Sequence, residues 1–74
     1  MGTVLHLYKG GDPRLVLAAI ERALAAGDHV GVALLHGATL SMLPGGVKAQ
    51  RVPDELPWEA LLEQIFASDQ VITW

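Results

Sequence analysis

The sequence has no cysteine among its 74 residues. This absence excludes disulfide bonds, thiolate metal sites and any persulfide carried by the chain itself, because each of these needs a cysteine sulfur. A domain of this length buries only about 60% of the surface of its extended chain, so it is marginally stable alone. Without disulfides, we expect association with other subunits to supply the missing stability.

Basic residues are also few. Five of them oppose eight acidic residues, for a net charge of −3, and they are scattered at Lys9, Arg14, Arg22, Lys48 and Arg51. Nucleic acids bind clustered positive charge, so we expect no direct contact with them. No apolar run approaches the roughly 20 residues that span a bilayer, and the first residues lack a secretory signal. We expect a cytoplasmic protein without a membrane partner.

Apolar residues, in contrast, make up 51% of the sequence. Residues 29–37 contain six consecutive apolar or glycine residues between His29 and His36. A run of this kind, without polar alternation, is typical of a strand that is buried on both faces of a parallel sheet. We expect the rest of the domain to pack around this strand.

Two helices are predicted with clear boundaries. Asp12 can cap a helix whose first residue is Pro13, and Gly27 can end it. The second helix carries the strongest apolar pattern, at i, i+3, i+4, i+7 and i+8 from Trp58 to Phe66. We expect both of these aromatic residues to lie in the core.

Three further strands and a weaker helical segment complete the prediction. Residues 3–8 form a strand, residues 47–52 form a short exposed strand, and residues 70–74 form a final strand with Val71 and Ile72 buried. Residues 38–43 are compatible with one or two helical turns. The order β-α-β-(short α)-β-α-β indicates one α/β domain over residues 1–74, with three layers and a four-stranded, largely parallel sheet.

Four short motifs carry a resemblance to a known family. They are Leu5-His6-Leu7-Tyr8-Lys9 at the start, Gly27-Asp28 before the apolar strand, His36-Gly37-Ala38 after it, and a final block over residues 58–74 that leads from an aromatic residue through a helix and a polar break to a strand ending in Trp74. With these motifs the chain resembles the DsrH/TusB family, which has the DsrE-like fold.

The resemblance implies a role in sulfur relay. Members of this family are subunits of assemblies that pass persulfide sulfur between proteins, in tRNA 2-thiolation or in sulfur oxidation. This chain is shorter than typical members between the second and third strands, and it lacks the thiolate that sulfur transfer requires. The resemblance therefore implies a non-catalytic interaction subunit that binds cysteine-bearing DsrE/DsrF-like (TusC/TusD-like) subunits, without a cofactor, or that forms a homo-oligomer.

The residues themselves suggest one candidate ligand site. Lys9, Gly10 and Gly11 follow the first strand, and His36 and Gly37 follow the apolar strand. Carboxyl ends of parallel strands meet at one edge of a sheet, where α/β domains place their ligands. A cation and free N–H groups there suit an anion, which gives the alternative function of a small anion- or metabolite-binding domain. The simpler interpretation is a tight turn and a polar strand end.

The remaining candidates concern burial and assembly. His6 is interpreted as a core residue. The alternative is a metal site formed by His6 and His36, but no carboxylate or thiolate at suitable spacing supports it. We therefore expect neither a metal site nor a catalytic residue. Trp74 is large for a small domain to bury, and residues 38–43 are weakly patterned. We expect an interface between subunits that contains Leu40, Met42, Leu43 and Trp74.

Overall fold

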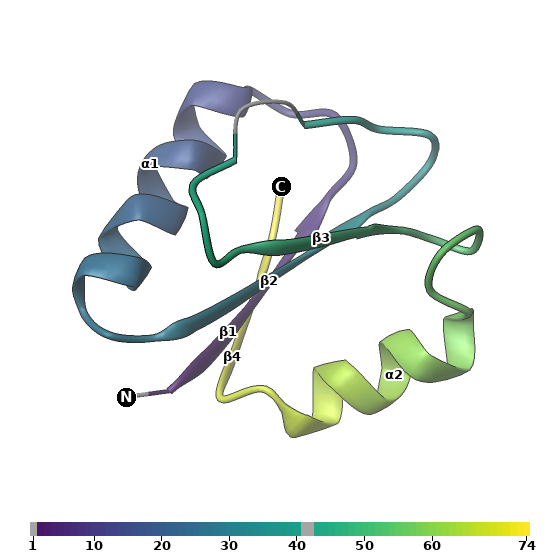
Figure 1. Ribbon diagram of the computed structural model, residues 1–74. Helices are drawn as coiled ribbons and strands as arrows, with labels where there is room; N and C mark the ends of the chain where they lie inside the picture. Colours follow the sequence, from purple (N-terminus) through teal and green to yellow (C-terminus); the bar gives the residue numbers. More distant parts are fainter. Residues whose placement is uncertain (1, 41–42) are drawn as a thin grey trace.

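The computed structural model describes residues 2–40 and 43–74. Its elements, in chain order, are β1 (Thr3–Tyr8), α1 (Pro13–Ala25), β2 (His29–Leu34), β3 (Lys48–Arg51), α2 (Trp58–Ala67) and β4 (Gln70–Thr73). The strands form one sheet in the order β3-β2-β1-β4, and every neighbouring pair is parallel. The helices lie on opposite sides of this sheet (Figure 1). The predicted three-layer α/β fold is confirmed.

The two interior strands, β1 and β2, separate two apolar layers. The layer toward α1 contains Tyr8, Val16, Ile20, Val30, Val32 and Leu34, and the layer toward α2 contains Leu5, Ala33, Leu35, Val52, Leu56 and Leu61. Side chains on each interior strand thus serve both faces, which is why the apolar run after His29 shows no polar alternation. The prediction that this strand is buried on both faces is confirmed.

Helix α1 begins and ends where local signals place it. The Asp12 carboxylate accepts a hydrogen bond from the Arg14 backbone N–H at 2.9 Å, and Pro13 occupies the first helical turn. That backbone hydrogen bond is the main reason why the pKa of Asp12 lies below its ordinary value. Gly27 follows the helix with φ 84°, a left-handed conformation that glycine adopts without strain. The helix packs on the sheet through Val16 and Ile20, which are fully buried.

Two carboxylates hold the amino ends of the strands. The Gly2 N–H donates to Oδ1 of Asp28 at 3.0 Å, and the Thr3 N–H donates to Oδ2 of Asp69 at 2.8 Å. Asp28 directly precedes β2 and Asp69 directly precedes β4, so each carboxylate connects the start of β1 to a neighbouring strand. The polar breaks after the two helices therefore have a structural task in this fold.

The segment between β2 and β3 differs from the prediction. Residues 38–40, 43 and 44 are not helical. Ala38, Leu40 and Leu43 instead pack as partly buried side chains against the layer toward α1. Pro44 disfavours the helical conformation at the residue before it, and six residues without caps gain little from a helix. Met42 lies outside the described residues.

Helix α2 is present as predicted, but its aromatic residues are not in the core. It packs on the sheet through buried Leu61 and partly buried Ile65. Trp58 and Phe66 are 54% and 85% exposed. The five apolar positions of this helix cover more than the side that one sheet face can bury, and a step from Leu61 to Leu62 turns the helix by about 100°. The prediction of core positions for Trp58 and Phe66 was wrong.

The two edge strands are less buried than the interior pair. β3 is short and has exposed ends, as expected. In β4, Val71 is 36% exposed and Ile72 is only partly buried, so the prediction that both are buried was wrong. β4 pairs with β1 alone, and no other strand of the described chain pairs with its outer edge.

Candidate functional site

The two predicted ligand loops lie at the same edge of the sheet. The Leu35 N–H donates to the Tyr8 carbonyl at 2.9 Å, so the chain leaves β1 and β2 at adjacent points. Lys9, Gly10 and Gly11 follow one strand and His36 and Gly37 follow the other, and all five residues are exposed. The structure therefore places these residues at one edge, which is the arrangement that the ligand prediction requires.

Backbone geometry accounts for part of this pattern. Gly10 and Gly37 have φ values of 109° and 72°, and His36 also has a left-handed backbone at φ 55°. The Tyr8 hydroxyl donates to the Gly11 carbonyl at 2.6 Å, which holds the loop after β1 in place. Asp12 already places a carboxylate at the amino end of α1, where its negative charge weakens the attraction of this end for a second anion.

A second polar arrangement lies deep in the domain. His6 is fully buried in β1, and its Nδ1 accepts a hydrogen bond of 2.9 Å from Nε1 of Trp74. The two ring planes are inclined by 25° and their centroids are 6.0 Å apart, so the rings meet edge to edge through this bond. Nε2 of His6 has no hydrogen-bond partner among the described residues. A buried polar atom without a partner costs about 1–3 kcal/mol. Among the buried side-chain nitrogen and oxygen atoms of the described residues, this nitrogen alone lacks a partner.

The bonding partner decides which nitrogen of His6 carries the proton. An indole N–H only donates, so Nδ1 must be the unprotonated acceptor, and the neutral ring carries its hydrogen on Nε2. Burial lowers the pKa of His6 below its ordinary value of 6.5. The ring is therefore a neutral hydrogen-bond donor at neutral pH, and its donor atom is Nε2.

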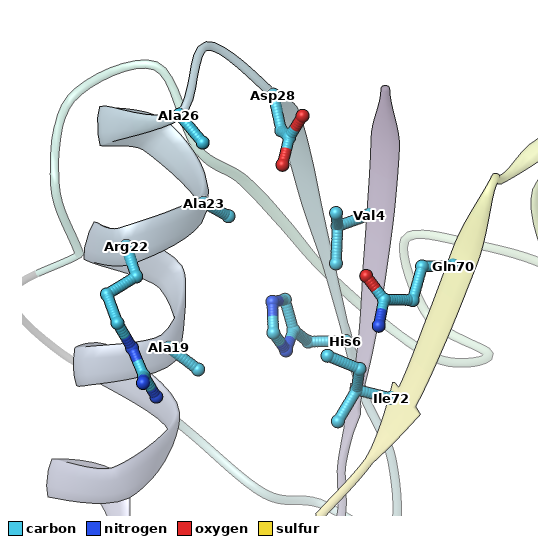
Figure 2. Close-up of a pocket in the computed structure, with 9 residues that line it drawn as sticks. All are labelled: Val4, His6, Ala19, Arg22, Ala23, Ala26, Asp28, Gln70 and Ile72. Carbon is cyan, nitrogen blue, oxygen red and sulfur yellow. The ribbon is translucent and has the colours of Figure 1, made fainter. Parts of the chain in front are cut away.

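A pocket of about 330 Å³ adjoins this ring, between α1 and the sheet. The residues that line it are Val4, His6, Ala19, Arg22, Ala23, Ala26, Asp28, Gln70 and Ile72. Figure 2 shows the His6 ring in the space between β1 and the helix, with Ala19 and Ala23 across from it. The small alanine side chains leave this space open, since bulkier residues at these positions would reach the sheet.

The pocket was not predicted from the sequence. Ala19 and Ala23 on α1 and Ala26 at its C-cap recur at helical spacing, a signal that this stretch is too small to fill the gap to the sheet. His6 and Trp74 are 68 positions apart, and no local pattern links them. Sequence reasoning identified His6 as a core residue, but it did not identify the open nitrogen.

The predicted ligand loops do not share this pocket. Lys9, Gly10, Gly11, His36 and Gly37 are absent from the lining of the pocket and from that of a smaller cavity of about 130 Å³ between β1 and α2. His6 is buried in β1 while His36 is exposed after β2, so the two imidazoles do not meet at one surface. Within residues 2–40 and 43–74, His, Asp and Glu side chains form no group of three that could hold a metal ion.

The predicted interface residues are mostly placed inside the domain. Trp74, Leu40 and Leu43 are partly buried and pack against the layer toward α1. Trp74 thus finds a place in the fold that sequence reasoning did not provide. The large apolar side chains that remain exposed include Trp58, Leu62 and Phe66 on α2 and Leu15 on α1. None of the helices in the described ranges combines the length and apolar character needed to cross a membrane.

Comparison of the chain with protein-family models, with curated proteins and with solved structures finds no match.

Proposed function

We propose that this chain is a non-catalytic interaction subunit of a sulfur-relay assembly, in which it binds a cysteine-bearing DsrE- or DsrF-like (TusC/TusD-like) subunit. The resemblance of its motifs to the DsrH/TusB family supports the choice of assembly. The three-layer fold with a parallel sheet is compatible with the DsrE-like fold that the resemblance implies. The proposal includes a cytoplasmic location.

The exposed side of α2 is the observation that carries the docking role. Trp58, Leu62 and Phe66 lie at i, i+4 and i+8, so they form one stripe along the helix, here called the α2 stripe. Their exposed fractions are 54%, 54% and 85%. Three large apolar side chains in a row on a 74-residue domain are costly to leave in water, and aromatic residues of this kind are typical anchors of protein interfaces.

The charges beside the stripe indicate the chemistry of the partner. Glu59 and Glu63 are exposed on the same helix, and α2 contains no basic residue. A partner surface that fits this helix has an apolar centre and basic residues at its rim. This charge pattern also disfavours pairing of two α2 helices face to face, because their carboxylates would repel each other.

The lack of cysteine determines what the subunit does in the assembly. A persulfide forms on a thiolate, and this chain offers none. The partner must therefore carry the sulfur, while this chain contributes binding surface and holds the partner in position. It has no sulfurtransferase activity of its own.

Affinity purification of the tagged chain from its native cells, followed by mass spectrometry, identifies the partner. The expected partner is a DsrE-like chain with a reactive cysteine, and persulfide labelling should mark that chain alone. In the recombinant complex, Phe66→Glu should weaken binding at least tenfold, because it places a charge in the apolar contact. Leu15→Glu is the matched control, since Leu15 is a similarly exposed apolar residue on α1, and it should leave affinity within twofold.

Two results would overturn the proposal. One is a chain that purifies without any cysteine-bearing subunit. The other is a complex that binds Phe66→Glu as tightly as the wild type, which would show that the α2 stripe is not the contact.

The alternative function is anion binding at the sheet edge formed by Lys9 and His36. It is favoured by the adjacent placement of the two loops and by their exposure. It is weakened by Asp12, whose carboxylate lies at the same edge. Titration with inorganic phosphate separates the two functions: saturable changes in the amide signals of Gly10 and Gly37, lost in Lys9→Ala, would support the alternative.

A further inference from the structure

The pocket between α1 and the sheet contains a donor that lacks an acceptor. His6 is fully buried, its Nδ1 is occupied by the Trp74 N–H, and its Nε2 has no partner in the described chain. The tautomer that this bond selects places the ring hydrogen on Nε2. Buried polar groups are nearly always paired, so an unpaired donor beside a pocket indicates a missing acceptor.

The walls of the pocket restrict what that acceptor can belong to. Most of them are apolar, with small or aliphatic side chains from α1 and its C-cap, β1 and β4, namely Val4, Ala19, Ala23, Ala26 and Ile72. Arg22 and Asp28 contribute one charge of each sign, so the ionised groups of the lining cancel. The volume of about 330 Å³ lies at the lower end of the range for small-molecule sites.

We propose that this pocket binds a small neutral organic molecule with an apolar body and a carbonyl oxygen that accepts the hydrogen bond from Nε2 of His6. The apolar walls match the body of the ligand. The cancelled charges favour a molecule without net charge, and the neutral imidazole requires an acceptor rather than a second donor. Gln70, an exposed residue of the lining, offers an amide for polar groups of the ligand.

This site is separate from the proposed docking role. The pocket lies on the α1 side of the sheet, whereas the α2 stripe belongs to the helix on the opposite side (Figure 1). A negative result for ligand binding would therefore leave the sulfur-relay proposal unaffected, and the reverse also holds. The open donor also gives selectivity, because a ligand without an acceptor leaves Nε2 unpaired and gains less from the same pocket.

The test uses the full chain and cyclohexanecarboxamide, a neutral probe with one apolar ring and one carbonyl oxygen. Nuclear magnetic resonance of the protein with ¹⁵N-labelled histidine follows the Nε2 signal of His6 during the titration. We expect a saturable shift of this signal with a dissociation constant on the order of 1 mM, as is usual for a probe of this size.

Three variants define the site. Ala19→Leu fills the pocket from the helix and should weaken binding at least tenfold, whereas Ala18→Leu, at an exposed position of the same helix, should bind like the wild type. His6→Phe keeps a ring but removes the donor, and should also weaken binding at least tenfold. Circular dichroism verifies the fold of each variant. If Ala19→Leu does not fold, Ala26→Leu closes the pocket from a more exposed lining position.

Several outcomes would overturn the proposal. One is the absence of a saturable His6 shift at 20 mM probe, on the order of twenty times the expected constant. A second is binding that Ala19→Leu or Ala26→Leu leaves unchanged, which would place the probe elsewhere. A third is a bound water that accepts the hydrogen bond from Nε2 of His6 and stays in place when the probe is added, because that water would then be the acceptor.

Discussion

The indole of Trp74 donates a hydrogen bond of 2.9 Å to Nδ1 of His6, and the planes of the two rings are inclined by only 25°. Trp74 follows the edge strand β4, and His6 lies in the middle of the interior strand β1. The contact thus fixes the tautomer of the buried imidazole from a position 68 residues away. One side chain at the edge of the sheet decides which nitrogen of this ring carries the hydrogen.

The first prediction removes this hydrogen bond. Trp74→Phe keeps an aromatic ring but leaves Nδ1 of His6 without a donor, which should lower the free energy of unfolding by about 1–3 kcal/mol. Urea denaturation measures the change. Trp58→Phe is the matched control, because Trp58 is 54% exposed on α2, and it should shift stability by no more than about 0.5 kcal/mol. Equal losses for both variants would contradict the assigned role of Trp74.

The second prediction concerns pH. Burial lowers the pKa of His6 in the folded protein below 6.5, its ordinary value in the unfolded chain. Between these two pKa values the unfolded state binds more protons, so the free energy of unfolding falls as the pH is lowered, by at most about 1.4 kcal/mol per pH unit. Above pH 6.5 this effect is absent. Protonation of Nδ1 also removes the acceptor for the Trp74 N–H.

Urea denaturation at a series of pH values between about 5 and 7 tests this effect. The carboxylates of Asp12 and Glu55 also have lowered pKa values in the folded protein, but their stabilising contributions are lost only below their ordinary values of 3.8 and 4.5. His6→Phe should flatten the profile, and His36→Gln, at an exposed position, should retain it. A wild-type profile that is already flat would show that His6 does not resist protonation.

Elements with signals in adjacent residues were predicted well. Asp12, Pro13 and Gly27 mark the ends of α1 in the sequence; in the structure Asp12 is the N-cap, Pro13 begins the helix, and Gly27 follows the C-cap with a left-handed backbone. The apolar run after His29 is typical of an interior strand, because such a strand is buried on both faces. Such signals act over a few residues, so they do not depend on the rest of the fold.

Burial and contacts that depend on tertiary packing could not be predicted in the same way. The apolar stripe of α2 is wide enough for two orientations, and the sheet face selects Leu61 and Ile65 while Trp58 and Phe66 stay outside. Position in the sheet also decides burial, since β4 at an edge leaves Val71 exposed. The candidate ligand loops were predicted as a pair because parallel strands align their carboxyl ends, whereas the pocket at His6 depends on contacts between distant elements.

The third prediction tests the carboxylate at the start of β2. Asp28→Ala removes the acceptor for the Gly2 N–H and should cost about 1–3 kcal/mol of stability, because a hydrogen bond to a carboxylate is lost. Asp54→Ala provides the comparison at an exposed position and should change stability little. Identical urea midpoints for the two variants would show that Asp28 does not hold the strands together.

The fourth prediction removes β4. Deletion of residues 70–74 eliminates the ladder with β1 and the bond from Trp74 to His6, and it exposes the β1 edge to water. A domain with about 5 kcal/mol of stability should then lose its cooperative thermal transition. Val71→Thr alone should have a small effect, because Val71 is 36% exposed. A truncated chain that melts like the full chain would show that β4 is dispensable.

The fifth prediction concerns assembly of the chain in the absence of other proteins. The sequence favours self-association through Leu40, Met42, Leu43 and Trp74. Of these residues, Leu40, Leu43 and Trp74 are partly buried against the layer toward α1, while the α2 stripe stays exposed. We therefore expect the purified chain to self-associate through the α2 stripe. The repulsion between Glu59 and Glu63 of facing helices should keep this association weak and make it stronger at high salt, which screens surface charges.

Analytical ultracentrifugation at micromolar concentration and at two salt concentrations measures this association. Phe66→Glu should shift the population toward monomer, because a carboxylate in the contact must be desolvated. Trp74→Ala should change association less than Phe66→Glu, since its indole is engaged with His6 inside the domain. Leu15→Glu controls for added charge on an exposed apolar position.

If Trp74→Ala dissociates a folded oligomer and Phe66→Glu does not, the contact lies on the α1 side, as the sequence alone suggests. A folded wild-type monomer at both salt concentrations would exclude self-association.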